Sequence, residues 1–199
     1  MQFKPILLLG LAAIASSFIL PNGATNGLYR AYYNDAGEEV HEPIDVGSFE
    51  NATTSSLPVV SNAPRSKRQE PQVKRNVETW CGCGIQMNVG DTNVANQQLA
   101  SQAQSGSRSP IMPGTAVYSV QNTAVAFACS IGPKYAFIDS NVVSDYAWQI
   151  TQACGWWVPG TARQNTYNPG AQVIDYGYMN YWSGLNFCGN AEESQAHSC

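Results

Sequence analysis

Cysteine and tryptophan are missing from the first 75 residues of this sequence, and all six cysteines and all five tryptophans follow Arg75. Positive charge is the next scarce feature. The residues after Arg75 carry three cations, Arg108, Lys134 and Arg163, against seven carboxylates, which leaves that part at a net charge of −4. Three dispersed cations cannot neutralise many phosphates. The sequence therefore excludes a basic patch, and we expect no nucleic-acid partner.

Long apolar runs are also scarce. The one candidate extends from Pro5 to Leu20, after Lys4. A membrane span needs about 20 apolar residues, so this run is too short for one and is typical of a secretory signal peptide. We predict a signal peptide over residues 1–20, in which Ala13-Ile14-Ala15 offers a cleavage site, although the cut could also fall later. We expect a secreted, extracellular product with no transmembrane segment.

Residues 21–75 are rich in Asn, Ser, Thr, Pro and Glu, which is the composition of a disordered segment. Two dibasic doublets, Lys67-Arg68 and Lys74-Arg75, lie at its end, where the composition changes. A kexin-like or furin-like protease cuts after such pairs. We therefore predict a disordered pro-segment over 21–75 and a mature domain over 76–199, with Asn76 as the first mature residue.

The six cysteines of the predicted mature domain form an even set in a chain that we expect to enter an oxidising compartment. An even set predicts three disulfides, with 15 possible connectivities. Cys81 and Cys83 are too close in sequence to pair comfortably with each other, so each should bridge to a distant cysteine. The cysteines are Cys81, Cys83, Cys129, Cys154, Cys188 and Cys199.

A metal site is the rival interpretation of some of these cysteines. Cys81, Cys83, Cys199 and His197 could supply the ligands. The paired C-x-x-C spacing of structural zinc sites is missing, and thiols are oxidised in the expected compartment. We therefore expect no metal and no cofactor.

Two helices are predicted. The first covers residues 92–104 with Asp91 as its N-cap, and the second covers 141–154 with Ser140 as its N-cap and Gly155 as its stop. Strands are expected in the rest, and residues 159–170 are expected to form a polar loop. The predicted strands are 115–120 and 123–129, joined as a hairpin at Gln121-Asn122, followed by 135–138, 156–158, 172–182 and 185–188. This order predicts an α+β sandwich, with two helices packed on one face of an antiparallel sheet.

The strand "AVAFAC", the helix end "QACG" and the later runs "YGYMNY" and "NFC" resemble small secreted α/β killer toxins of fungi and related effector-like proteins. The order of signal peptide, pro-segment, Lys-Arg pair and cysteine-rich domain also resembles kexin-processed fungal effectors, including host-selective necrotrophic toxins. The resemblance covers roughly residues 66–199. It implies a secreted effector or toxin that binds a host or competitor protein.

Catalytic groups are few in the predicted mature domain. Its one histidine, His197, is three residues from the end, and its even cysteine count argues against a free thiolate nucleophile. Asp139, Asp145 and Asp175 are the carboxylates that a glycosidase could use. We expect a protein that is not an enzyme and assign no catalytic residue. Two alternatives stay open, a small secreted cell-wall hydrolase and a structural wall or surface protein.

Aromatic side chains offer a binding surface instead. Trp156 and Trp157 follow the predicted helix stop, and tyrosines crowd the strand region that comes after the polar loop. Exposed aromatic surface on a small secreted protein often marks a partner site. The candidate binding residues are Trp156, Trp157, Tyr178, Tyr181 and Trp182.

Overall fold

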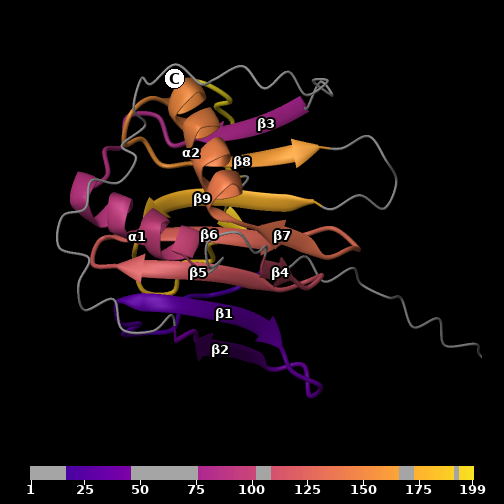
Figure 1. The fold of residues 1–199 in the computed structure, drawn as a ribbon. Coiled ribbons are helices and arrows are strands. Elements are labelled where there is room, and N and C mark those ends of the chain that lie inside the picture. The colour runs from indigo at the N-terminus through magenta and orange to yellow at the C-terminus, as the bar shows by residue number, and fades with distance from the viewer. Residues whose placement is uncertain (1–16, 46–75, 102–108, 166–172, 191–192) are drawn as a thin grey trace, which may run out of the picture.

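The computed structural model describes residues 17–45, 76–101, 109–165, 173–190 and 193–199 (Figure 1). Seven strands form one antiparallel sheet in the order β2-β1-β5-β6-β9-β8-β3, and β4 and β7 form a small second sheet. The strands are β1 (Gly27–Tyr33), β2 (Glu39–Pro43), β3 (Asn76–Cys81), β4 (Ser109–Ile111), β5 (Ala116–Gln121), β6 (Ala124–Ser130), β7 (Ala136–Ile138), β8 (Gly160–Asn165) and β9 (Ile174–Asn180).

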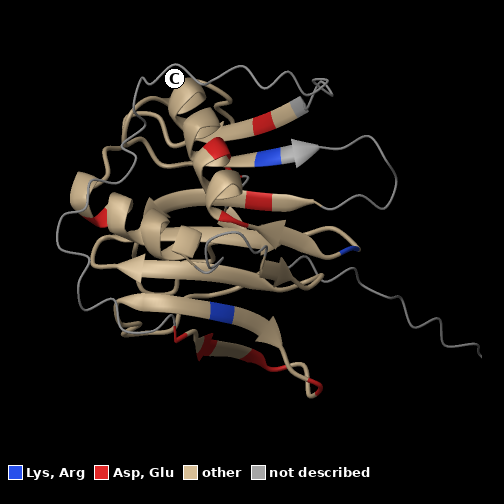
Figure 2. Cartoon of the chain, viewed as in Figure 1, with Lys and Arg blue, Asp and Glu red and all other residues tan. Residues whose placement is uncertain are grey.

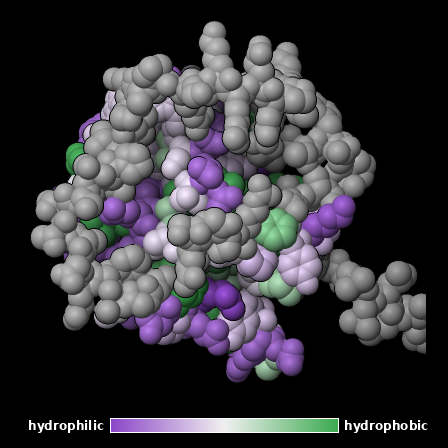
Figure 3. All heavy atoms as spheres, viewed as in Figure 1, coloured by the Kyte–Doolittle hydropathy of each residue, from purple (hydrophilic) through white to green (hydrophobic). Residues whose placement is uncertain are grey.

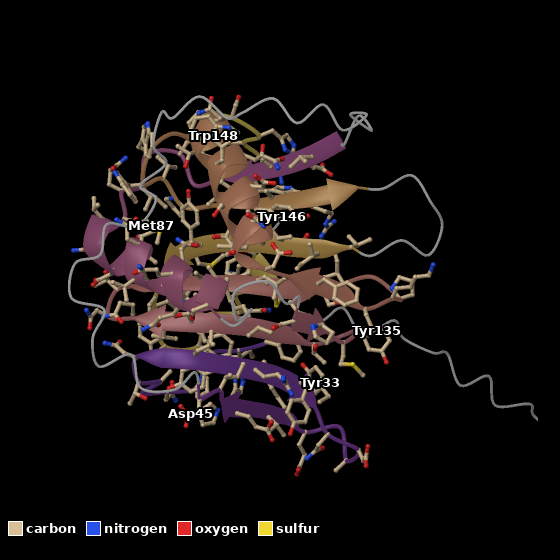
Figure 4. The ribbon with its side chains drawn as sticks, viewed as in Figure 1. Tyr33, Asp45, Met87, Tyr135, Tyr146 and Trp148 are labelled. Carbon is tan, nitrogen blue, oxygen red and sulfur yellow. A yellow bond between two sulfur atoms is a disulfide. The ribbon has the colours of Figure 1, made fainter. Side chains whose placement is uncertain are left out.

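Two helices, α1 (Val89–Ser101) and α2 (Ser140–Cys154), lie across one face of the large sheet (Figure 1). Leu99 of α1 and Ile150 of α2 are fully buried in the core between the helices and the strands. Tyr146 of α2 reaches down to Tyr176 of β9, with 5.7 Å between the ring centroids (Figure 4). The α+β prediction, with two helices on an antiparallel sheet, is confirmed.

Both helices begin slightly earlier than the sequence predicts. The Asn88 side chain accepts from the Asp91 N–H, three residues on, which is the bond an N-cap makes. Asp139 does the same for the Val142 N–H at 2.8 Å, so Asp139 caps α2 and Ser140 is its first residue. The predicted caps Asp91 and Ser140 are therefore wrong. Gly155 ends α2 as predicted, with a φ of 101° that favours glycine.

The centre of the sheet is apolar on both faces. Strands β5 and β6 form the predicted hairpin, and every residue of β6 is buried. On the face opposite the helices, Phe18 and Leu20 from the N-terminal part join Leu185 and Phe187 from the C-terminal part. These four side chains pack with Tyr118 and Phe127. Burial of each such side chain stabilises the fold by about 1.5–3 kcal/mol.

The prediction that residues 21–75 are disordered is wrong for residues 27–43. β1 pairs with β2 on one side and with β5 on the other, and Leu28 and Ala31 are buried on opposite faces of the sheet. The composition misled because a hairpin at a sheet edge needs few apolar residues when the sheet supplies the hydrogen-bonding partner. The dibasic doublets lie outside the described residues.

The core on the face opposite the helices limits where a signal peptide could be cut. Phe18 and Leu20 fall inside the predicted 1–20 segment, yet they are 0% and 1% exposed. A cut after residue 20 would remove both side chains, whereas a cut after Ala15 keeps them. We therefore expect the Ala13-Ile14-Ala15 site to be used. Signal cleavage itself stays a prediction, as does dibasic cleavage.

Two local strand predictions and one loop prediction are wrong. Residues 156 and 157 form a turn, residues 185–188 contribute only an isolated bridge between Asn186 and Ile19, and the predicted polar loop 159–170 contains β8. β8 is polar in sequence, but Thr161 and Ala162 are buried between β3 and β9. Pairing on both sides makes this segment a strand in spite of its composition.

The six cysteines form three disulfides, as predicted: Cys81–Cys154, Cys83–Cys199 and Cys129–Cys188. The first ties the end of β3 to the end of α2. The second ties the residue after Gly82 to the C-terminal tail. The third ties β6 to the segment that covers the face opposite the helices. Cys81 and Cys83 thus bridge to different distant cysteines.

Candidate binding site

Several loops meet at one end of the sheet. In the strand register, Cys81 at the end of β3 faces Gly160 at the start of β8, and Gly160 faces Tyr178 near the end of β9. The loop after β3, the turn before β8 and the segment after β9 must therefore lie at the same end. We call this region the tryptophan end, defined by Ile85, Met87, Trp156, Trp157 and Trp182.

The turn before β8 presents two tryptophans. Trp156 is 48% exposed and Trp157 is half-buried, and their ring centroids are 5.9 Å apart. Trp157 has a φ of 60°, in the left-handed region that side chains other than glycine rarely adopt. Holding a bulky residue there costs about 1–3 kcal/mol, and such outliers concentrate at ligand sites. Trp156 and Trp157 therefore lie in a turn and not in the predicted strand 156–158.

The turn is clamped to the loop after β3. The Met87 N–H donates to the Trp157 carbonyl at 2.9 Å, and the Gly82 N–H donates to the Pro159 carbonyl at 2.8 Å. A Cβ at position 82 would lie 2.8 Å from the Pro159 ring, so only glycine fits between Cys81 and Cys83 without a shift. The Cys81–Cys154 disulfide joins the end of β3 to the end of α2, directly before the loop and the turn.

The other three predicted binding residues divide between surface and core. Trp182 is 48% exposed. Tyr178 is buried, and desolvation raises the pKa of its hydroxyl. Tyr181 is half-buried and packs against the cluster on the face opposite the helices. Tyr178 is therefore a core residue, and period-2 alternation alone could not show this because β9 is buried on both faces.

Sequence reasoning missed Ile85, which is 46% exposed and lies in the loop that Met87 fastens to Trp157. An isolated isoleucine in a polar loop is the signal that could have drawn attention to it. Val89 at the start of α1 is equally exposed. Both lie two residues from Met87, whose N–H donates to the Trp157 carbonyl.

A second exposed apolar cluster lies toward the opposite end of the sheet, around β4 and β7. Figure 3 shows it as green and pale residues at the right of the described surface. Met87 and Tyr135 mark the two ends in Figure 4. Neither β4 nor β7 contains a cysteine, and the nearest bridged cysteine in sequence is Cys129, two residues before Ile131. The cluster consists of Met112, Ile131, Tyr135 and Phe137.

Two of the three carboxylates considered for hydrolysis, Asp139 and Asp175, have structural roles, and the third, Asp145, is half-buried on α2. Asp175 is fully buried and accepts two hydrogen bonds from the Arg163 guanidinium, each of 2.6 Å. Arg163 also stacks over the Trp80 ring, 5.2 Å from its centroid. The Asp139 side chain caps α2. Figure 2 shows a basic residue on β8 between acidic residues on the neighbouring strands β3 and β9.

His197 and the cysteines, the other candidate catalytic or metal-binding groups, also have structural contacts. The Nδ1 of His197 lies 2.6 Å from the Thr79 carbonyl oxygen, which fastens the C-terminal tail to β3. Among the described residues, no group of three or more His, Cys, Asp or Glu side chains is placed to hold a metal ion. Cys81, Cys83 and Cys199, which the rival interpretation used as ligands, are all in disulfides.

Comparison with known proteins identifies no relative of this chain. No family model matches the sequence, and no curated protein or solved structure matches it significantly. Within the part of the chain that the structure describes, neither helix is long and apolar enough to cross a membrane.

Proposed function

We propose that this protein is a secreted fungal effector or toxin that acts by binding a host or competitor protein through the tryptophan end. One observation carries the proposal. An exposed Trp156 lies beside a Trp157 in the left-handed backbone region, in a turn that two backbone hydrogen bonds fix to the loop after β3. The Cys81–Cys154 disulfide joins the two elements that precede this loop and this turn. A rigid surface loses little conformational entropy on binding.

A protein partner fits the chemistry of this surface better than a charged ligand. Tryptophan is enriched among the residues that dominate protein interfaces. Neither Lys nor Arg is present in residues 82–90 or 155–160, so an anionic ligand would find no cation in these two loops. The two loops also contain no carboxylate. Apolar and aromatic contact is what remains for recognition.

The experiment compares Trp156→Ala with Tyr135→Ala. The two side chains are 48% and 49% exposed, and they lie at opposite ends of the sheet. Secreted protein is infiltrated into host leaves and applied to competing fungi. We expect Trp156→Ala to lower potency at least about tenfold, since a dominant interface residue contributes about 2 kcal/mol or more. Tyr135→Ala should retain full potency.

Circular dichroism and thermal unfolding should show that both variants are folded. Equal potency of the two variants would contradict the assignment of the site. If the wild-type protein caused no response at micromolar dose and hydrolysed cell-wall glycan instead, the effector proposal would fail.

A further inference from the structure

We propose that residues 17–45 are a permanent part of the mature protein, which after dibasic cleavage consists of two chains held together without a covalent bond. The inference rests on dibasic cleavage and is independent of the target. The docking surface comprises the edge of β5, the apolar face of β5 and β6 opposite the helices, and the part of the helix-side core that receives Leu28. Its occupant is the segment of residues 17–45.

The segment completes the core on both faces of the sheet. Phe18 and Leu20 cover the face opposite the helices, where Phe18 lies beside Phe187 with 6.3 Å between ring centroids. Leu28 of β1 is buried in the core on the helix side. Removal of the segment would expose Tyr118 and Phe187, which are fully buried in the intact fold. An apolar surface of this kind favours rebinding.

Hydrogen bonds fix the segment in register. β1 pairs with β5 from Gly27 opposite Val120 to Ala31 opposite Ala116. The Leu20 N–H donates to the Leu185 carbonyl at 2.9 Å. The His41 Nδ1 and the Tyr118 hydroxyl lie 2.8 Å apart. Loss of the segment would leave the edge of β5 without its partner strand, and unpaired strand edges attract other chains.

Residues 17–45 are also tied to one another, so they can act as one unit after a cut. The Ile19 N–H donates to Glu39 Oε1 at 2.6 Å, and the Tyr33 hydroxyl donates to the Ser17 carbonyl at 2.6 Å. Phe18 stacks on Tyr33 with 5.3 Å between centroids. The first residues and the hairpin therefore support each other.

The position of the cysteines makes the association noncovalent. No cysteine precedes Cys81, so no disulfide can join residues 17–45 to the rest of the protein. Both dibasic doublets lie between Asp45 and Asn76, in the part of the sequence that separates the two chains of the proposed complex. A cut at either doublet would divide the sequence without removing any strand from the sheet.

The test is to secrete the full chain from a fungal host that has a kexin-like protease. The protein is purified by native size exclusion, and its intact mass is measured under denaturing, nonreducing conditions. We expect one native peak that separates on denaturation into two chains, one of which contains residues 17–45. A variant with Lys67, Arg68, Lys74 and Arg75 all changed to Ala should elute at the same native volume as a single chain.

Every other result would overturn the proposal. Recovery of residues 76–199 alone would show that the segment is released, and recovery of one uncut wild-type chain would show that no two-chain form exists.

Leu28→Ala and Arg30→Ala then test the docking surface, because Leu28 is buried and Arg30 is exposed on the same strand. Leu28→Ala should raise the Kd of the two chains about 30-fold or more, and Arg30→Ala less than about threefold.

Folding of both variants is checked in the uncut quadruple-alanine background by resistance to a nonspecific protease. If Leu28→Ala is folded in that background and still retains the N-terminal chain as tightly as Arg30→Ala does, the docking surface is wrong.

Discussion

The two edges of the large sheet are held by different means. At the β3 edge, the Cys81–Cys154 disulfide joins the strand to α2, and the Cys83–Cys199 disulfide follows directly. At the β2 edge there is no cysteine, and the hairpin is held by the β1–β5 ladder and by buried side chains such as Leu28. The comparison teaches that a strand can belong to the core of a disulfide-rich protein without being covered by its disulfides.

Breaking the covalent edge should give the largest effect. Replacement of Cys81 and Cys154 together by Ser removes a bridge between residues 73 apart in sequence. The loss should lower the free energy of unfolding by about 4 kcal/mol, because the unfolded chain regains the entropy of the closed loop. Denaturant unfolding measures this. Hydrogen exchange should show the greater loss of protection in β3 and β8.

The comparison of edges would be wrong if the same double variant lost protection equally in β1 and β2. Potency should also fall in this variant, because Cys154 precedes the turn that carries Trp156 and Trp157. Unchanged potency in a folded, unbridged protein would contradict the view that the bridge fixes the tryptophan end.

Breaking the noncovalent packing of residues 17–45 should give an effect of similar or smaller size. Leu20→Ala removes a side chain that is 1% exposed and should cost about 2–5 kcal/mol of unfolding free energy. Its neighbour Ile19 is 50% exposed, and the hydrogen bond of Ile19 to Glu39 uses the backbone N–H. Ile19→Ala should therefore change stability by about 0.5 kcal/mol or less.

Both variants are measured in a chain secreted with a foreign leader placed before Ser16, so that signal cleavage does not interfere. Equal stability of Leu20→Ala and Ile19→Ala would show that residues 17–20 do not contribute to the core.

The smallest effect is expected for a contact between the two edges of the sheet, where α1 meets the β5–β6 turn. The Asp91 carboxylate accepts from the Thr123 hydroxyl at 2.6 Å and from the Asn122 side chain, and these hydrogen bonds lower the pKa of Asp91 below 3.8. A carboxyl group whose pKa is lower in the folded state than in the unfolded state stabilises the fold at pH values above its unfolded pKa. This stabilisation is lost as the pH falls through the folded pKa. Thr123→Val should therefore be less stable at pH 6 by about 1 kcal/mol or less.

That difference should shrink as the pH falls below 3.8, and thermal unfolding at pH 6 and pH 3 measures it. A difference that is the same at both values would mean that the ionised Asp91 is not responsible.

Helix α2 and the β5–β6 hairpin show which parts of the fold could be predicted. In α2, Val143, Tyr146, Ile150 and Cys154 recur at helical spacing, and all four are buried. In the hairpin, two apolar runs flank a short polar turn, so local composition and tertiary packing agree. Asn122 takes a φ of 44° in that turn, which asparagine tolerates better than most residues.

Strands β1, β2 and β8 show the opposite case. Their sequences contain many polar residues. β1 pairs with β5, as Gly27 does with Val120, and β8 pairs with β3, so these partners are distant in sequence, whereas β2 is added to β1 as a local hairpin. The candidate site divides in the same way. The tryptophan pair was visible in the sequence, but the exposure of Ile85 and the burial of Tyr178 depend on elements that arrive from elsewhere in the chain.

The sequence by itself determined that six cysteines are collected after the dibasic doublets, that cations are too few for nucleic acid, and that two helices and a central hairpin form an α+β fold. These properties depend on composition and local periodicity. Tertiary structure alone decided which cysteines pair, that Trp157 is held in the left-handed region, and that residues 17–45 belong to the sheet. The physical reason is that each of these depends on contacts between residues far apart in sequence, whose stability comes from burial and pairing in the folded chain.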